Sequence, residues 1–171
     1  MKTIRVIVLF AVALGQAALV HAEFRAGIAV RVVTPEPLLP VSGGVGPSNP
    51  VTKKQGDLTV RAMVLESGGT RVVFVSTDFL GFPAVLGDRV RRQVKSIPPG
   101  HILIGATHTH SAPDCYGFPN GRGGTDADLE YLNFVCNKAA EAVNEAIAGL
   151  EPASIRIATG KANGKIAYNY Y

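Results

Sequence analysis

Two histidines that lie two residues apart, His108 and His110, are the side chains of this sequence best suited to chemistry. They belong to the stretch Gly105–Asp114, which follows the apolar run Ile102-Leu103-Ile104, typical of a buried strand. Residues two apart on an extended backbone point to the same side, so both imidazoles would face one place. Zinc binds imidazole nitrogens readily, so the spacing predicts a metal site. The alternative is structural, with one histidine capping the strand or bonding a carbonyl.

Further ligands are needed, because a catalytic zinc normally takes three protein ligands and two histidines are too few. Asp78 is the best further candidate, since it also follows an apolar strand. It could bind the metal or orient a ligand from the second shell, and a plain turn cap explains it equally well. Asp114 is a weaker candidate, and a loop-capping role suits it better.

Strands and helices that position these side chains follow from the hydrophobic pattern. Alternation and β-branched residues predict strands, and apolar residues at helical spacing predict helices. We expect a strand over 24–33, a hairpin of 58–66 with 71–76, a helix over 83–97, a strand over 101–106, a helix from a capping box at Thr125 and Asp128 to residue 150, and a strand over 153–158. This order predicts an α/β fold with a mixed β-sheet flanked by helices.

A long loop between the first two strands, residues 38–55, is rich in proline and glycine and carries Gly43-Gly44-Val45-Gly46. Loops of this length in a compact domain are uncommon unless they are functional, so it is expected to shape a binding site. A phosphate-binding loop is the alternative, but the strand-turn-helix context that such a loop needs is missing.

Residues 1–22 have the pattern of a secretory signal peptide. Lys2 and Arg5 precede the apolar segment Val6–Leu14, and small residues precede a cleavage point after Ala22. A short membrane anchor is the alternative, but the apolar segment is brief for a span. The chain is therefore expected to be exported, either secreted or periplasmic.

The charge of the chain does not indicate nucleic-acid binding. Removal of residues 1–22 takes away two basic residues and no acidic ones, which lowers the formal net charge from +4 to +2. The basic residues between Arg89 and Lys95 lie on a helix-like stretch and are typical of a solvated face. We expect no nucleic-acid partner.

Two cysteines, Cys115 and Cys136, remain in a chain that is expected to reach an oxidising compartment. A disulfide between them would stabilise the chain by about 3 kcal/mol. Cys136 also suits a buried free thiol, because it lies at helical spacing from apolar residues. Cys115 as a metal ligand beside His110 is a third interpretation.

Several segments, taken in order and spacing, resemble the amino-terminal catalytic domain of the neutral/alkaline ceramidases. They are Ala26-Gly27-Ile28-Ala29 through Thr34-Pro35, Gly43-Gly44, Asp57-Leu58 leading to Arg61-Ala62, Val72–Val75 followed by Asp78, and Gly105-Ala106-Thr107-His108-Thr109-His110-Ser111. Together they span nearly all of residues 26–120. Where the family typically continues Ser-Gly-Pro-Gly, this sequence has Ser111-Ala112-Pro113-Asp114, a local departure that bears on the substrate.

The resemblance implies that His108 binds Zn²⁺ and that His110 lies in the active site. The family's other ligands, a histidine, a glutamate and a tyrosine, and its serine lie well downstream of this motif, and none is found before Tyr171. The resemblance therefore implies that residues 23–171 are the amino-terminal portion of a larger, ceramidase-like zinc hydrolase domain. A fragment of this kind is expected to be inactive alone.

The expected activity of the full-length enzyme is zinc-dependent hydrolysis of an N-acyl amide, with ceramide split into sphingosine and fatty acid. A lipid-like amide substrate is the expected partner, and peripheral contact with a membrane is expected of the full-length protein. Two alternatives stay open. The same scaffold could act on another amide or ester, since a fold does not determine a substrate, or the histidines could be structural in a non-enzymatic secreted domain.

Overall fold

The computed structural model describes residues 23–161. Along the chain these form β1 (Arg25–Val32), β2 (Thr59–Ser67), β3 (Thr70–Thr77), α1 (Ala84–Gln93), the short 3-10 helix η1 (Pro99–His101), β4 (Ile102–Ala106), α2 (Leu129–Ala148) and β5 (Glu151–Pro152). The signal peptide predicted for residues 1–22 lies outside the described residues. Within 23–161, no helix has the length and apolar character needed to cross a membrane.

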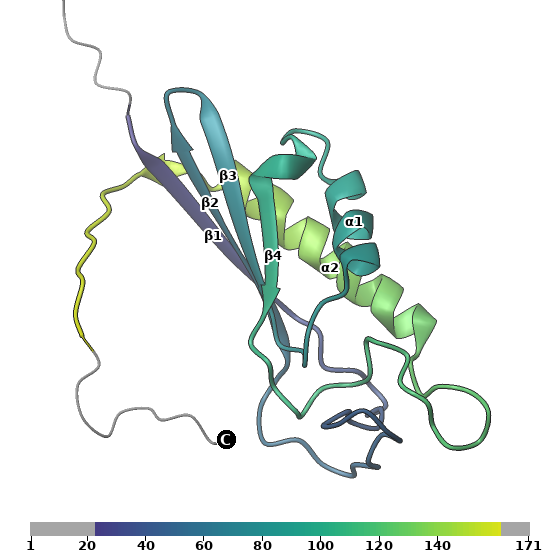
Figure 1. The fold of residues 1–171 in the computed structure, drawn as a ribbon. Coiled ribbons are helices and arrows are strands. Elements are labelled where there is room, and N and C mark those ends of the chain that lie inside the picture. The colour runs from purple at the N-terminus through teal and green to yellow at the C-terminus, as the bar shows by residue number, and fades with distance from the viewer. Residues whose placement is uncertain (1–22, 162–171) are drawn as a thin grey trace, which may run out of the picture.

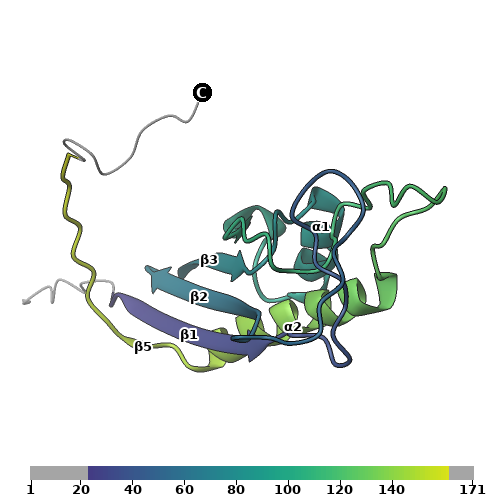
Figure 2. The same cartoon turned by 90° about the horizontal axis from the view of Figure 1, so that it is seen from below.

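The strands of the described residues form one sheet in the order β4-β3-β2-β1-β5. The pairs β3–β2, β2–β1 and β1–β5 are antiparallel, and the pair β3–β4 is parallel. Figure 1 shows α1 and α2 on the same side of this sheet, and Figure 2 shows α2 running along β1 and β2. Because parallel neighbours need a crossover connection, α1 joins β3 to β4. The predicted α/β class with a mixed sheet is confirmed.

The hydrophobic core lies between the sheet and the two helices. Alternate residues of each strand point into it, and Val60, Val64 and Val73 are fully buried there. Helix and sheet approach each other closely at Gly27, where an added Cβ would lie 1.9 Å from the carbonyl oxygen of Ala146. Glycine at this position therefore allows α2 to lie directly against β1.

The opposite face of the sheet is apolar and exposed. Ile28, Met63, Phe74 and Leu103 are cross-strand partners in one row over four strands, and Ile28 is 75% exposed. The sequence pattern predicts a sheet flanked by helices. Within residues 23–161, the helices cover one face only.

The hairpin of β2 and β3 is confirmed, and its turn has the geometry that the sequence Ser67-Gly68-Gly69 suggests. Gly68 and Gly69 have φ angles of 57° and 76°, which side chains other than glycine rarely adopt. Two consecutive residues of this kind match the right-handed twist of the strands.

Two predicted helix boundaries and one predicted strand are wrong. The first helix ends at Gln93, short of residue 97. The second begins after Asp128, whose carboxylate accepts from the N–H of Tyr131, and Thr125 is therefore not its cap. The strand expected over 153–158 is absent, because β5 pairs with β1 only at Glu151–Pro152 and the isoleucines that follow are exposed. The local sequence at these segments is typical of a cap and of a strand, but the contacts with the rest of the fold select other boundaries.

Candidate functional site

Two loops meet at the carboxyl ends of the parallel strands β3 and β4. Thr77 of β3 pairs with Ala106 of β4, and the N–H of Thr107 donates to the carbonyl of Thr77 at 2.9 Å. Residues 78–82 and 107–118, which follow these strands, are called the strand-end loops below. Open α/β sheets bind ligands at this edge, because the loops after parallel strands converge there. Asp78 and the two histidines are all in these loops, as the sequence predicts.

His108 is held by its backbone and by its ring. Its φ angle is 63°, a left-handed value that is uncommon for a residue other than glycine. Its Nδ1 lies 2.6 Å from the carbonyl oxygen of Leu80. A carbonyl oxygen can only accept, so Nδ1 carries the proton and Nε2 keeps its lone pair free. Metal-binding histidines have this arrangement, in which a second-shell carbonyl fixes the ring.

His110 lies beside His108, so the structure brings the histidine pair together. The ring centroids are 5.1 Å apart with an interplanar angle of 79°. The loop after β1 packs against the other side of His110, where an added Cβ on Gly43 would lie 3.4 Å from the His110 Cβ. A bridge between Ser42 and Ala112 fixes this contact. The long glycine-rich loop therefore borders the pair, as expected for a loop that shapes a site.

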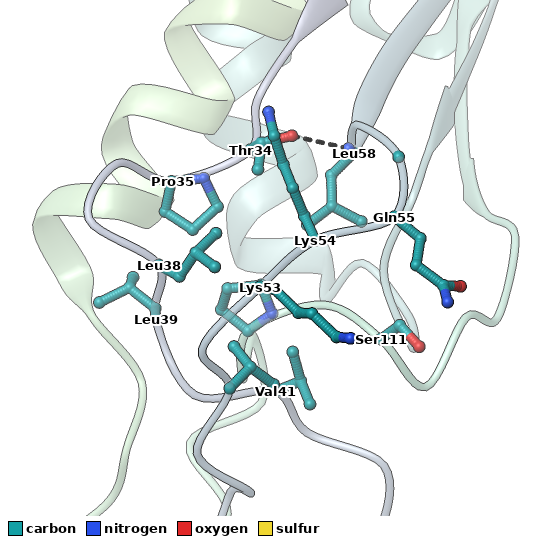
Figure 3. A pocket seen from close by; sticks show the side chains of 13 residues that line it. Thr34, Pro35, Leu38, Leu39, Val41, Lys53, Lys54, Gln55, Leu58 and Ser111 are labelled. Carbon is teal, nitrogen blue, oxygen red and sulfur yellow. Dashed lines mark hydrogen bonds between the residues drawn. The ribbon is translucent and has the colours of Figure 1, made fainter.

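A cavity of about 420 Å³ lies between the loop after β1 and the segment that directly follows His110. Ser111, which directly follows His110, is part of its wall, together with Lys53 and Leu38 (Figure 3). Cavities of ~300–1,000 Å³ are the usual size of small-molecule sites. The size of this cavity suits a small-molecule ligand, and Ser111 is the lining residue that lies nearest to His110 in the sequence.

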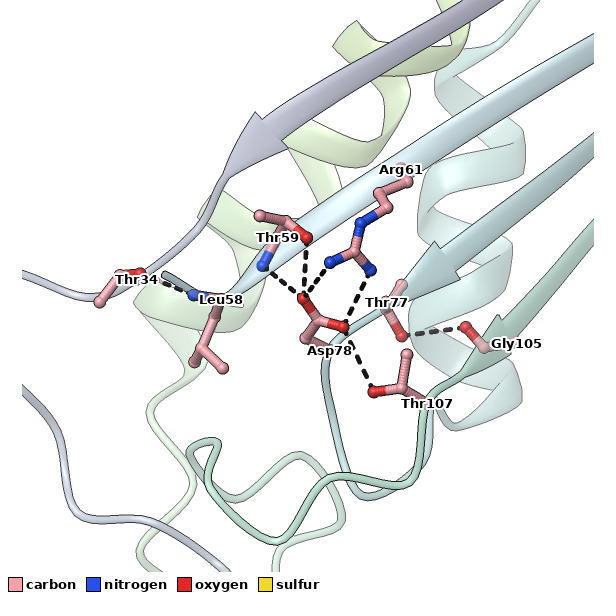
Figure 4. Close-up of polar contacts among 8 residues, drawn as sticks. All are labelled: Thr34, Leu58, Thr59, Arg61, Thr77, Asp78, Gly105 and Thr107. Atoms are coloured by element: carbon pink, nitrogen blue, oxygen red, sulfur yellow. Dashed lines mark hydrogen bonds and ion pairs between the residues drawn. The ribbon is translucent and has the colours of Figure 1, made fainter. Parts of the chain in front are cut away.

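Asp78 is saturated by hydrogen bonds, as Figure 4 shows. Its Oδ2 accepts from the backbone N–H and hydroxyl of Thr59 at 2.9 and 2.8 Å, and Arg61 binds both carboxylate oxygens at 3.1 and 3.2 Å. The hydroxyl of Thr107 donates to Oδ1 at 3.3 Å. Asp78 therefore positions the residue before His108, and its oxygens are already engaged with protein donors.

The pKa of Asp78 is lower than usual. Partial burial of the carboxylate raises the pKa, but the hydrogen bonds from Thr59 and the guanidinium of Arg61 outweigh it. Arg61 belongs to a segment that carries the ceramidase resemblance, but its pairing with Asp78 is not predicted from the sequence. The available signal was a charged residue at an outward position of a strand whose other outward residues, such as Met63, are apolar.

Asp114 organises the second strand-end loop. It is 1% exposed, and its carboxylate accepts from the backbone N–H groups of Tyr116, Gly117 and Phe118 at 2.8–3.1 Å. A buried carboxylate is stable only when it is bonded in this way. The loop-capping role expected from the sequence is confirmed.

The disulfide considered for Cys115 and Cys136 is absent from the structure, and both residues are buried free thiols. They face different carbonyls, with the Cys115 thiol 3.1 Å from Gly81 and the Cys136 thiol 3.7 Å from Leu86. Burial raises the pKa of Cys115 to about 11. Cys115 as a metal ligand beside His110 stays a prediction.

The donor atoms at the strand-end loops fit part of a zinc site. Among residues 23–161, no cluster of three or more histidine, cysteine or acidic side chains could hold a metal ion. His108 nevertheless has the free Nε2 and the fixed ring of a ligand, and His110 is adjacent. These residues supply at most two ligands, fewer than a catalytic zinc takes.

The architecture is that of an α/β unit with its polar side chains at the carboxyl ends of two parallel strands. No protein-family model matches the chain, and no curated protein matches it. The solved structures that it resembles include one described as a ceramidase complexed with C2, with 22% identity and a TM-score of 0.62, and neutral ceramidase from Pseudomonas aeruginosa, with 22% identity and a TM-score of 0.59.

This chain thus has the fold of part of the neutral ceramidases, as its resemblance to them implies. Each match covers 77% of this chain and 22% of the ceramidase chain. The chain spans about a fifth of the length of these two structures. At this identity the likeness establishes the fold, and chemistry must be argued from the site itself.

Proposed function

We propose that this chain supplies part of the active site of a zinc-dependent hydrolase that cleaves N-acyl amides, with ceramide as its leading substrate. The observation that carries the proposal is the geometry of His108, whose ring is fixed through Nδ1 by Leu80 and whose Nε2 is free. This geometry occurs in a ceramidase-like fold. The remaining ligands would come from outside the described residues.

His108 would bind the metal through Nε2. Zinc bound there would polarise the amide carbonyl and make water available as hydroxide near neutral pH. The contacts of Thr107 with Asp78 and Thr77 hold the strand end in place, so the position of the His108 ring is set before substrate arrives. A preorganised ligand of this kind costs little reorganisation during the reaction.

His110 would transfer protons during cleavage. It is adjacent to His108 and partly shielded by Gly43, so a substrate carbonyl held at His108 would be within its reach. An imidazole can take up and release a proton near neutral pH, as the conversion of an amide into an amine and a carboxylate requires. Hydrolysis would break the C–N bond, and water would supply the hydroxyl of the acid and a proton for the amine.

The test is release of fatty acid from a short-chain ceramide by the full-length protein. We expect the activity to stop with a chelator, to return with zinc, and to disappear in His108→Ala. His101→Ala is the matched control, because the Nδ1 of His101 also lies against a carbonyl, that of Arg71 at 3.0 Å, outside the site. Activity that survives both chelation and His108→Ala would disprove the proposal.

A second candidate is the same chemistry on another amide. It is favoured by the segment Ala112-Pro113-Asp114, because Asp114 builds the loop that follows the histidine pair. Comparing fatty-acid release from ceramide with release from short N-acyl amides separates the two candidates. Export of the chain and contact of the full-length protein with a membrane remain predictions that belong to either candidate.

A further inference from the structure

The cavity that Ser111 borders has an apolar wall. Most of its apolar side chains come from the segment between β1 and β2, and one comes from the segment after His110: Pro35, Leu38, Leu39, Val41, Val51, Leu58 and Pro113. Figure 3 shows the consecutive residues Leu38 and Leu39 on one stretch of this loop. An apolar lining of this kind favours a hydrocarbon chain over a polar ligand, because contact with the wall removes apolar surface from water.

The polar side chains of the cavity include cations and no carboxylate. They are Thr34, Lys53, Lys54, Gln55 and Ser111. Lys54 is neutralised, since its Nζ lies 2.5 Å from a carboxylate oxygen of Asp57. Within residues 23–161, Lys53 has no ion-pair partner.

The side chain of Lys53 lies on the same side of the cavity as Ser111 (Figure 3). In Figure 3 its side chain extends toward Ser111, the residue directly after His110. A lysine ammonium and a serine hydroxyl are both hydrogen-bond donors. An anionic oxygen at this point would form an ion pair with Lys53 as well as hydrogen bonds. A neutral amide or hydroxyl oxygen would form hydrogen bonds without the ion pair.

We propose that this cavity binds a single-chain amphiphilic carboxylate, with its hydrocarbon chain against Leu38 and Leu39 and its carboxylate at Lys53. The orientation rests on the proposed function, because it places the carboxylate end toward the histidine pair. Two compounds share this chemistry: the fatty acid that amide hydrolysis releases, and an N-acyl amino acid whose carboxylate lies next to the scissile amide. Ceramide itself is uncharged and would not engage Lys53 in this way.

Binding to the full chain should be measured by calorimetric or NMR titration with two matched pairs. Octanoate is compared with octanamide, and N-octanoylglycine with N-octanoylglycinamide, each below its micellar range, at low salt and in the presence of EDTA. We expect at least one carboxylate to bind about threefold to fivefold more tightly than its neutral partner, as for an exposed ion pair. The pair with the larger preference identifies which source the cavity accepts.

Variants locate the two ends of the ligand. Lys53→Gln should abolish the preference for the carboxylate, and Lys53→Arg should retain it. Lys95→Gln makes the same change in net charge at a residue outside the cavity lining, and should leave the preference intact. Leu38→Asn should weaken the binding of all four compounds, because it places an amide where the hydrocarbon chain packs.

The proposal is overturned if neither carboxylate binds more tightly than its neutral partner, or if the preference persists in Lys53→Gln. Loss of the preference in Lys95→Gln would also overturn it, since general attraction to a basic protein would then explain the result. None of these measurements needs zinc or turnover. The cavity proposal can therefore fail while hydrolysis stands, and the hydrolase proposal can fail while carboxylate binding stands.

Discussion

The core under the helices and the strand-end loops are held together by contacts of different kinds. In the core, apolar side chains such as Leu132 pack between α2 and the sheet. In the loops, Asp78 and Asp114 each accept several hydrogen bonds, and His108 donates one to Leu80. Apolar burial is non-directional, whereas a hydrogen bond fixes particular atoms. It follows that the core decides whether the chain folds, and the loops decide where the histidines point.

Leu132→Ala should have the largest effect on stability. Leu132 is buried in α2, so truncation removes buried apolar area and leaves a cavity. The expected loss is about 3 kcal/mol in the free energy of unfolding, measured by urea denaturation. Leu129→Ala is the control, because Leu129 is exposed on the same helix and its loss should cost little. Equal losses in the two variants would show that the core is not packed as described.

Asp114→Ala should act within one loop. It leaves the N–H groups of Tyr116, Gly117 and Phe118 without their acceptor, which we expect to cost about 2 kcal/mol of local stability. Hydrogen exchange at these three amides should speed up, while amides of β2 and β3 keep their protection. Asp114→Asn keeps one acceptor oxygen, so its exchange rates at these amides should lie between those of the wild type and of Asp114→Ala. Uniform acceleration over the whole chain would contradict a local role.

Asp78 should give the chain a stability that depends on acid. Its folded-state pKa lies below the unfolded value of ~3.9, so its contribution is fully present above about pH 4 and is lost as the pH falls through the lower folded pKa. Urea midpoints between pH 2 and 6 should show this loss in the wild type. In Asp78→Asn, the part of the acid-dependent loss that comes from Asp78 should be missing. At neutral pH the substitution should cost about 1 kcal/mol. An identical pH dependence in both proteins would refute the role assigned to the Asp78 contacts.

The smallest expected effect concerns the two cysteines, whose thiols should not react with an alkylating reagent while the chain is folded. Burial raises the pKa of both thiols, that of Cys115 to about 11, so little thiolate exists at pH 8. Native protein should resist iodoacetamide, and denatured protein without a reducing agent should react at two thiols. If no thiol of the denatured, unreduced protein reacted with iodoacetamide, the two cysteines would instead form the disulfide.

Features that depend on nearby residues could be predicted from the sequence. The hairpin turn at Gly68-Gly69 and the exit of His108 from a strand are of this kind, because alternation and glycine placement are local signals. The boundary at Thr125 was wrong for the same reason: a cap pattern there competes with the one at Asp128, and the packing of α2 decides between them.

Contacts between distant segments could not be predicted. Gly43 meets His110, and Arg61 meets Asp78, only because the sheet brings separate loops and strands to one edge. Lys53 gave no local signal at all, since its significance lies in the cavity that it borders. The pattern of the chain indicated which residues could do chemistry, and the fold showed which of them are neighbours.

The most direct test is the zinc affinity of the full-length protein and of two of its histidine variants. His108 and His101 are both exposed, and each has its Nδ1 against a backbone carbonyl, but only His108 lies beside a second imidazole at the strand-end loops. The account predicts that His108→Ala loses zinc and that His101→Ala keeps it. Unchanged zinc affinity in His108→Ala would contradict the assignment of His108 as a ligand.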